Sequence, residues 1–270
     1  MVKKAKSNED YQVLVINLDK DVKRWDDISK SCAAAGIKCN RFPATNGAHI
    51  KITNLENNQV FYGIDLKKDK FIEQNKKYQI TCDSNDSKTF EFNFIGYTYK
   101  KNSVSSGELG LWCSELKALY AVKDSGKSLV LLEDDVKFFG NFIQNFENFY
   151  EHLPASADVA LLDYRLKSSK DTLIPVNEYV HTFGKQASGY ATWAMLFTPK
   201  GINKILSVKE YSYPTDKFYW CISNGNLGAR IHSNFNCHDN KGLIEMYGSS
   251  VGLIDITGAE STIASMGREF

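Results

Sequence analysis

The hydrophobic positions along the chain form two kinds of pattern, continuous apolar runs typical of buried strands and a helical spacing typical of amphipathic helices. Continuous apolar runs rich in branched residues occur at 11–18, 128–132 and 159–162 and predict buried strands. Apolar positions with helical spacing predict helices at 22–32, 105–123 and 142–153. Weaker patterns predict strands at 38–42, 190–197 and 227–232, and a short helix ending at Leu206.

Local signals at the predicted helix ends support this assignment. Ser105 and Glu108 have the spacing of a capping box, and Thr198 followed by Pro199 is typical of a helix start. Gly36 and Gly126 are suited to the residue just after a helix. Strands that alternate with helices predict an α/β fold, with a mostly parallel sheet flanked by helices on both faces.

Residues 1–10 are polar and predict a flexible tail, so that 11–270 are expected to form a single domain. Within it, residues 46–104 are rich in Asn, Lys, Asp and Ser and have period-two patches at 89–99, which predict an insertion containing a β-hairpin. This hairpin either packs on the surface or contributes to acceptor binding. The sequence after residue 240 carries only weak structural signals.

Composition narrows the classes of function. The chain has 33 Lys and Arg against 32 Asp and Glu, a balance that gives no basic footprint for nucleic acid. Its six cysteines lack CxxC spacing, and Cys32 and Cys113 fall on apolar helix stripes, so reduced thiols in a cytoplasmic protein are expected. No apolar stretch is long enough to cross a membrane, which predicts a soluble chain, or one held at the membrane periphery.

Acidic residues follow the predicted strands. Glu133, Asp134 and Asp135 come directly after the run at 128–132, Asp19 follows the first strand and Asp163 another. Ligands of such sheets bind beyond the carboxyl ends of the strands. Mg²⁺ and Mn²⁺ prefer oxygen ligands, often one or two carboxylates with substrate phosphates. Side chains alternate along an extended strand, so Glu133 and Asp135 are expected to point the same way and bind such a cation. The alternative to a cation site is that Glu133, Asp134 and Asp135 only form a loop and cap a helix.

Several segments, in order over about residues 11–220, resemble glycosyltransferase family 25, the family of lipooligosaccharide and collagen galactosyltransferases. The segments that carry the resemblance are Val15–Asp19 with Arg24, Ser106–Gly110 with Ser114, Leu131–Val136, Gly189–Ala191 with Thr198–Gly201, and Pro214–Asp216. The family pattern has a His after the helix Ser, and this chain has Glu115 there. The resemblance implies a GT-A type fold, a UDP-sugar donor (often UDP-galactose), Mn²⁺ and inversion at the anomeric carbon.

Direct displacement needs a neutralised diphosphate, a base for the acceptor hydroxyl and aligned reactants. The metal ligands are expected to be Glu133 and Asp135, with a third from His232, His238 or Asp239, of which we favour His238. The candidate base is Asp216, with Asp163 as second choice; each has a capping role as its structural alternative. Donor contacts are expected from Asn17, Leu18, Arg24, Gly107, Glu108 and Asp134. Glu108 has an alternative role as a helix cap, and Gly107 in close packing.

The sequence thus predicts a metal-dependent hexosyltransferase, for galactose or glucose, acting on a glycan or protein hydroxyl. A metal-dependent nucleotidyltransferase is an alternative, but 18–25 lacks the glycine-rich phosphate loop that such an enzyme usually has near its first strand. A non-catalytic relative that binds sugar or a protein partner is the other alternative. Glu115 in place of His favours it, and the acidic triplet argues against it.

Overall fold

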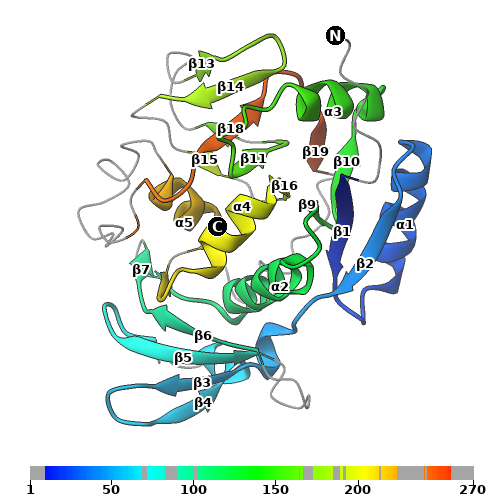
Figure 1. Cartoon of the computed structure of the whole chain (residues 1–270). Coiled ribbons are helices and arrows are strands. Elements are labelled where there is room, and N and C mark those ends of the chain that lie inside the picture. Colours follow the sequence, from blue (N-terminus) through cyan, green and yellow to red (C-terminus); the bar gives the residue numbers. More distant parts are fainter. Residues whose placement is uncertain are drawn as a thin grey trace.

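Two sheets and a helix between them organise the molecule (Figure 1). The computed structural model describes residues 10–67, 72–82, 90–99, 102–163, 165–166, 173–184, 189–190, 193–212, 214–223, 240 and 242–256. The helices of these residues are α1 (Val22–Ala34), α2 (Ser106–Val122), α3 (Phe142–Glu151), α4 (Pro199–Leu206) and α5 (Thr215–Ile222), with short 3₁₀ turns η1 (Gly47–His49) and η2 (Gly63–Lys67).

The larger sheet has eight strands within the described part of the chain, and its directions are mixed. From one edge to the other it contains β13 (Leu173–Pro175), β14 (Val180–Phe183), β18 (Met246–Ser249), β11 (Val159–Leu161), β16 (Ala194–Phe197), β9 (Ser128–Glu133), β1 (Tyr11–Asn17) and β2 (Cys39–Pro43). Strand β1 pairs in parallel with both β2 and β9, whereas β16 is antiparallel to β9 and β11.

The α/β class is therefore confirmed, but the prediction of a mostly parallel sheet was wrong. No helix lies between β11 and β16 among the described residues, and a strand that returns without a crossover helix enters the sheet antiparallel. Strand β18 also lies in the middle of this sheet, although its sequence gave only weak signals. The GT-A type stays a prediction.

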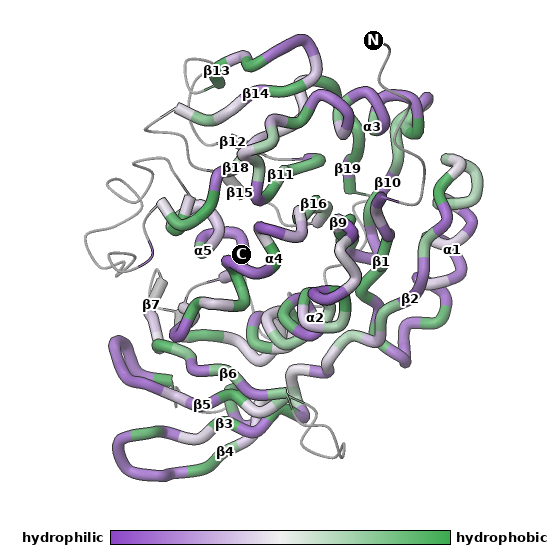
Figure 2. The backbone as a smooth tube through the Cα atoms, viewed as in Figure 1, coloured by the Kyte–Doolittle hydropathy of each residue, from purple (hydrophilic) through white to green (hydrophobic). Residues whose placement is uncertain are grey.

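Side-chain alternation along the strands divides the apolar residues into two cores. Leu14, Ile16 and Leu131 face the core that contains α2, α4 and α5, whereas Val15 and Leu132 face the core that contains α1 and α3. Helices thus cover both faces of the sheet, as predicted. Figure 2 shows hydrophobic positions concentrated on β1, β9 and β16 at the centre.

The predicted insertion supplies four of the five described strands of a second sheet, which packs against α2 (Figure 1). Among the described residues this sheet has five strands, in the order β17 (Tyr211–Ser212), β6 (Phe90–Ile95), β5 (Lys77–Cys82), β3 (Lys51–Asn54) and β4 (Val60–Tyr62). The predicted hairpin is present as β5 and β6, which pair antiparallel from Lys77 to Cys82. Its inward residues join the core shared with α2, so this hairpin packs into the fold, and a contribution to acceptor binding stays a prediction.

A disulfide between Cys82 on β5 and Cys113 on α2 ties the insertion to the rest of the fold. Cys221 on α5 is also disulfide-bonded. The expectation of reduced thiols was therefore wrong for these cysteines, because neither the sequence nor the apolar stripe shows which cysteines meet in space. Cys32 is a buried free thiol, as predicted, and Cys39 is free as well.

Three two-stranded ladders complete the described structure. They are β10 (Val136–Phe138) with β19 (Ile254–Ile256), β12 (Arg165–Leu166) with β15 (Gly189–Tyr190), and β7 (Thr98–Tyr99) with β8 (Asn102–Ser103). Of the strand predicted at 190–197, the second half is present as β16, whereas that predicted at 227–232 lies outside the described residues.

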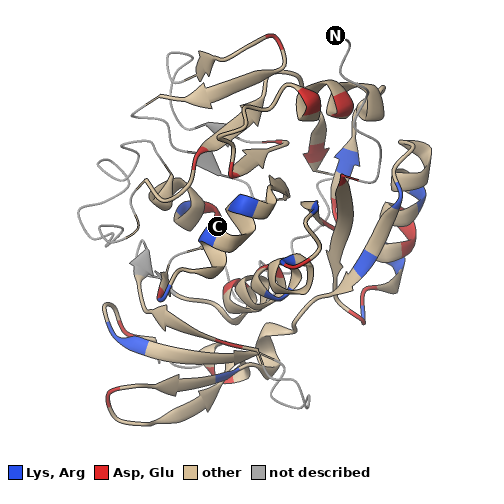
Figure 3. Cartoon of the chain, viewed as in Figure 1, with Lys and Arg blue, Asp and Glu red and all other residues tan. Residues whose placement is uncertain are grey.

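Charged residues are spread over both sheets and several helices (Figure 3). Among the helices that the structure describes, none has the length and apolarity needed to span a bilayer. The predicted tail at 1–10 lies almost wholly outside the described residues, and the assignment of 11–270 to one domain stays a prediction.

Candidate functional site

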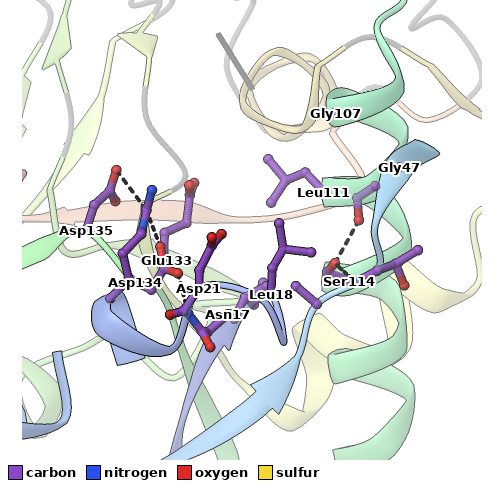
Figure 4. A pocket seen from close by; sticks show the side chains of 15 residues that line it. Asn17, Leu18, Asp21, Gly47, Gly107, Leu111, Ser114, Glu133, Asp134 and Asp135 are labelled. Atoms are coloured by element: carbon purple, nitrogen blue, oxygen red, sulfur yellow. Dashed lines mark hydrogen bonds and ion pairs between the residues drawn. The ribbon is translucent and has the colours of Figure 1, made fainter. Parts of the chain in front are cut away.

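The carboxyl ends of β1 and β9 meet at one edge of the larger sheet and form one wall of a pocket (Figure 4). Because the two strands are parallel with Ile16 beside Glu133, the residues that follow them lie next to each other. Asn17, Leu18 and Arg24 line this wall together with the acidic triplet. The structure thus brings together the residues that the sequence placed at two strand ends.

Asp134 is held by protein groups. The amide of Asn17 donates a hydrogen bond of 2.7 Å to Asp134 Oδ2, and Arg24 forms an ion pair with Asp134 Oδ1. Asn17 is almost fully buried and accepts a hydrogen bond of 2.8 Å from Arg41 Nε on β2. Asn17, a predicted donor contact, therefore fixes the middle carboxylate of the triplet.

Glu133 and Asp135 have unfavourable electrostatic surroundings. Burial raises the pKa of Glu133 well above its ordinary value, and the charge of Asp135 raises it further. Burial also raises the pKa of Asp135, against the opposing effect of the Arg24 guanidinium, whose nitrogen lies 3.5 Å from Asp135 Oδ2. Asp135 Oδ1 is buried without a hydrogen-bond partner. An unsatisfied carboxylate oxygen in an acidic pocket is suited to a hard cation.

A divalent cation at this wall would need further ligands. Within the described ranges, no group of three or more His, Cys, Asp or Glu side chains is placed to hold a metal ion. The predicted third ligand, His238, lies outside those ranges, as do the alternatives His232 and Asp239. Two carboxylates completed by phosphate oxygens are one common arrangement for Mg²⁺.

The first turns of α2 and residues 44–47 form the opposite wall (Figure 4). A Cβ on Gly110 would lie 2.8 Å from the Gly47 nitrogen and 2.9 Å from the Thr45 carbonyl oxygen, so glycine allows this segment to cross the helix closely. Ser114 Oγ accepts a hydrogen bond of 2.9 Å from Thr45 N and holds the crossing in place. Gly107 lines the pocket beside this crossing.

Glu108 lies beside this wall but is not among the residues that line the pocket. Its carboxylate closes the predicted capping box with Ser105 and accepts a hydrogen bond of 2.8 Å from the Tyr97 hydroxyl. The structure therefore supports its capping role, and its donor contact gains no support from this geometry.

The two candidate bases also lie outside the pocket lining. Asp216 is in the first turn of α5, where Pro214 is the N-cap, and its Oδ2 lies 3.4 Å from Lys217 Nζ. Its charge raises the pKa of Glu115 on α2, whose own charge raises that of Glu133. Glu115 is thus close enough to interact with both Asp216 and Glu133. Asp163 is half-buried just after β11.

Sequence reasoning missed several residues of the site. Asp21, Thr45, Gly47 and Leu111 line the pocket, and Arg41 anchors Asn17. Leu111 has a sequence signal, because it follows Gly107 by one helical turn. Thr45 and Gly47 have none, because a tertiary crossing brings them to α2.

The fold and the site define an α/β protein with a ligand pocket at the carboxyl ends of parallel strands, with an acidic wall opposite a glycine-lined helix. Residues 10–194 match the family described as glycosyltransferase family 25 (LPS biosynthesis protein). The chain belongs to this family, as the sequence motifs predicted, and thereby to the glycosyltransferases. The match includes every pocket residue and ends before α5. No curated protein matches the sequence.

Proposed function

We propose that the chain transfers a hexose, galactose or glucose, from a UDP-sugar to a hydroxyl group of a glycan or protein, with inversion and with Mn²⁺ or Mg²⁺ as cofactor. The observation that carries this proposal is the pocket itself, in a member of a glycosyltransferase family: the acidic triplet and the start of α2 line it together, and Asp135 has a buried carboxylate oxygen without a hydrogen-bond partner.

Glu133 and Asp135 are the residues that would hold the cation, through carboxylate oxygens. A cation bound there would neutralise charge on the diphosphate leaving group as the bond to the sugar breaks. Asp134 has a different role, because Asn17 and Arg24 already occupy its two oxygens.

The protein groups around the acidic wall orient the donor. The Arg24 guanidinium lies between Asp134 and Asp135, where it can also donate to a phosphate oxygen. On the opposite wall, Gly107 presents the first turn of α2 to the pocket without a side chain, and a helix N-terminus favours an anionic group. The diphosphate is therefore expected between these two walls, with Asn17 and Leu18 beside the nucleoside.

Asp216 is the proposed base, and it would accept the proton of the acceptor hydroxyl as oxygen attacks the anomeric carbon. Its side chain is partly exposed to solvent, whereas that of the neighbouring Lys217 is buried. Asp163 is the second candidate. Asp216 is favoured because its neighbour Thr215 hydrogen-bonds to Glu115, which follows the pocket residue Ser114 on α2.

A donor screen tests this proposal. UDP release is measured with UDP-galactose and UDP-glucose, with Mn²⁺ or Mg²⁺, against several sugar acceptors and water. The wild type is expected to release UDP, and Asp216→Asn to keep UDP binding while losing release. UDP binding without release from any donor would instead identify a binding relative. Absence of UDP binding would contradict the proposal.

A further inference from the structure

Glu115 is a buried carboxyl group to which the proposed reaction assigns no role. It lies on α2 directly after Ser114, and only 1% of its surface is exposed. Two neighbouring residues on this turn of α2 therefore contact different parts of the fold. Ser114 holds the pocket segment at Thr45, and Glu115 faces α5.

Two hydroxyl groups of α5 hydrogen-bond to the Glu115 carboxyl. Tyr219 donates from its hydroxyl to Glu115 Oε2 at 3.1 Å, and the side chain of Thr215 also hydrogen-bonds to Glu115. Thr215 and Tyr219 are one helical turn apart, so they lie on the same face of α5. Both are buried, which makes these contacts costly to leave unmade. Glu115 thus fixes α5 at two points, Tyr219 in its second turn and Thr215 in its first turn.

This first turn carries Asp216, between the two anchoring residues. We propose that Glu115 is a positioning residue, which acts through Thr215 and Tyr219 to hold Asp216 in register with the acidic triplet. The inference rests on the proposed function, because it assumes that Asp216 is the base.

The electrostatics agree with this role. Glu115 lies close enough to both Glu133 and Asp216 for each pair to interact, and burial raises the pKa of Glu115 to about 8. At neutral pH, Glu115 is therefore mainly a neutral acid, which adds no third charge close to Glu133 and Asp216. Glutamine is close to this neutral form in shape and retains an oxygen acceptor.

The test compares four variants by UDP release from UDP-galactose with Mn²⁺ and by calorimetric binding of UDP with Mn²⁺. Glu115→Ala removes the anchor, and the double variant Thr215→Val with Tyr219→Phe removes the same two hydrogen bonds from α5 without emptying the core. Glu115→Gln is the conservative replacement. Tyr211→Phe is the matched control, because it removes a buried tyrosyl hydrogen bond to the Ile205 carbonyl instead.

Displacement of a reacting group by about 1 Å lowers turnover by about 100-fold. Glu115→Ala and the double variant are therefore expected to lower kcat by about 10- to 100-fold, with the donor KM and the UDP affinity nearly unchanged. Glu115→Gln and Tyr211→Phe are expected to keep kcat within about threefold. If Glu115→Ala does not fold, the double variant decides.

Unchanged kcat in the double variant would overturn the inference, as would an equal loss in Glu115→Gln. A parallel loss of UDP affinity would also overturn it, since Glu115 would then act through the donor pocket. Wild-type protein that binds no UDP would overturn the proposed function itself, which is a distinguishable result because it needs no variant.

Discussion

The disulfide between Cys82 and Cys113 provides a quantitative test of how the insertion is attached to the fold. It joins β5 to α2 across a sequence separation of 31 residues, and both cysteines are fully buried. A crosslink stabilises the folded state mainly by restricting the unfolded chain. For a loop of this length the expected contribution to the free energy of unfolding is about 4 kcal/mol.

Urea unfolding of the wild type and of the double variant Cys82→Ala with Cys113→Ala measures this contribution. Without reductant, the variant is expected to be less stable by about 4 kcal/mol, plus a smaller loss of packing where the sulfur atoms are removed. With reductant, both proteins lack this crosslink, so most of the difference should disappear. Loss of the second disulfide, at Cys221, affects both proteins equally and cancels.

Cys39→Ala is the matched control, because Cys39 is a free, half-buried thiol, and its replacement should leave the effect of reductant unchanged. Peptide mapping without reduction should recover Cys82 and Cys113 in one linked fragment. Equal stability of the wild type and the double variant without reductant, or alkylation of both cysteines in unreduced protein, would refute this reasoning.

Three further predictions concern single side chains. Burial raises the pKa of Glu115 from 4.5 to about 8, so the stability of the wild type should fall as pH rises between these values. Urea unfolding at pH 5 to 8 should show no such fall in Glu115→Gln. At pH 8 this variant should be more stable than the wild type by about 4 kcal/mol. A difference that is constant over this range would contradict the burial of an ionisable acid. Burial lowers the pKa of His181 to about 4, so stability should fall as pH drops from about 6.5 towards 4. His181→Asn should reduce this loss of stability at acidic pH, measured by urea unfolding. The same loss in the variant would exclude His181 as its source. Gly110→Ala should lower stability by about 1–3 kcal/mol and weaken UDP binding, because the added Cβ would meet the backbone at Thr45 and Gly47. Gly140→Ala is the control, because nothing lies within 4 Å of a Cβ at that position. Equal stability and UDP affinity of the two variants would be inconsistent with the close crossing.

Much of the local structure could be predicted because its determinants are local. The capping box at Ser105 and Glu108, the Thr198 cap and Gly36 at a φ of +76° all act within a few residues of the chain. The acidic wall was also predictable, because two parallel strands bring Asn17 and Glu133 to the same edge of the sheet.

Features that depend on distant contacts could not be predicted in this way. The direction of β16 and the place of β18 depend on the path of the chain after β11, and the pairing of Cys82 with Cys113 depends on how the insertion packs. For the same reason the sequence identified Glu115 as a departure from the family pattern but could not show its contacts with Tyr219 and Thr215.

The central claim is that Asp135 and Glu133 hold a divalent cation that helps to bind a nucleoside diphosphate. Calorimetric titration of UDP, with and without Mn²⁺, tests it in the wild type, in Asp135→Asn and in the exposed control Asp124→Asn. Mn²⁺ should strengthen UDP binding by about tenfold or more in the wild type and the control, and this gain should be lost in Asp135→Asn. The same Mn²⁺-dependent gain in Asp135→Asn, or no gain in the wild type, would contradict the claim.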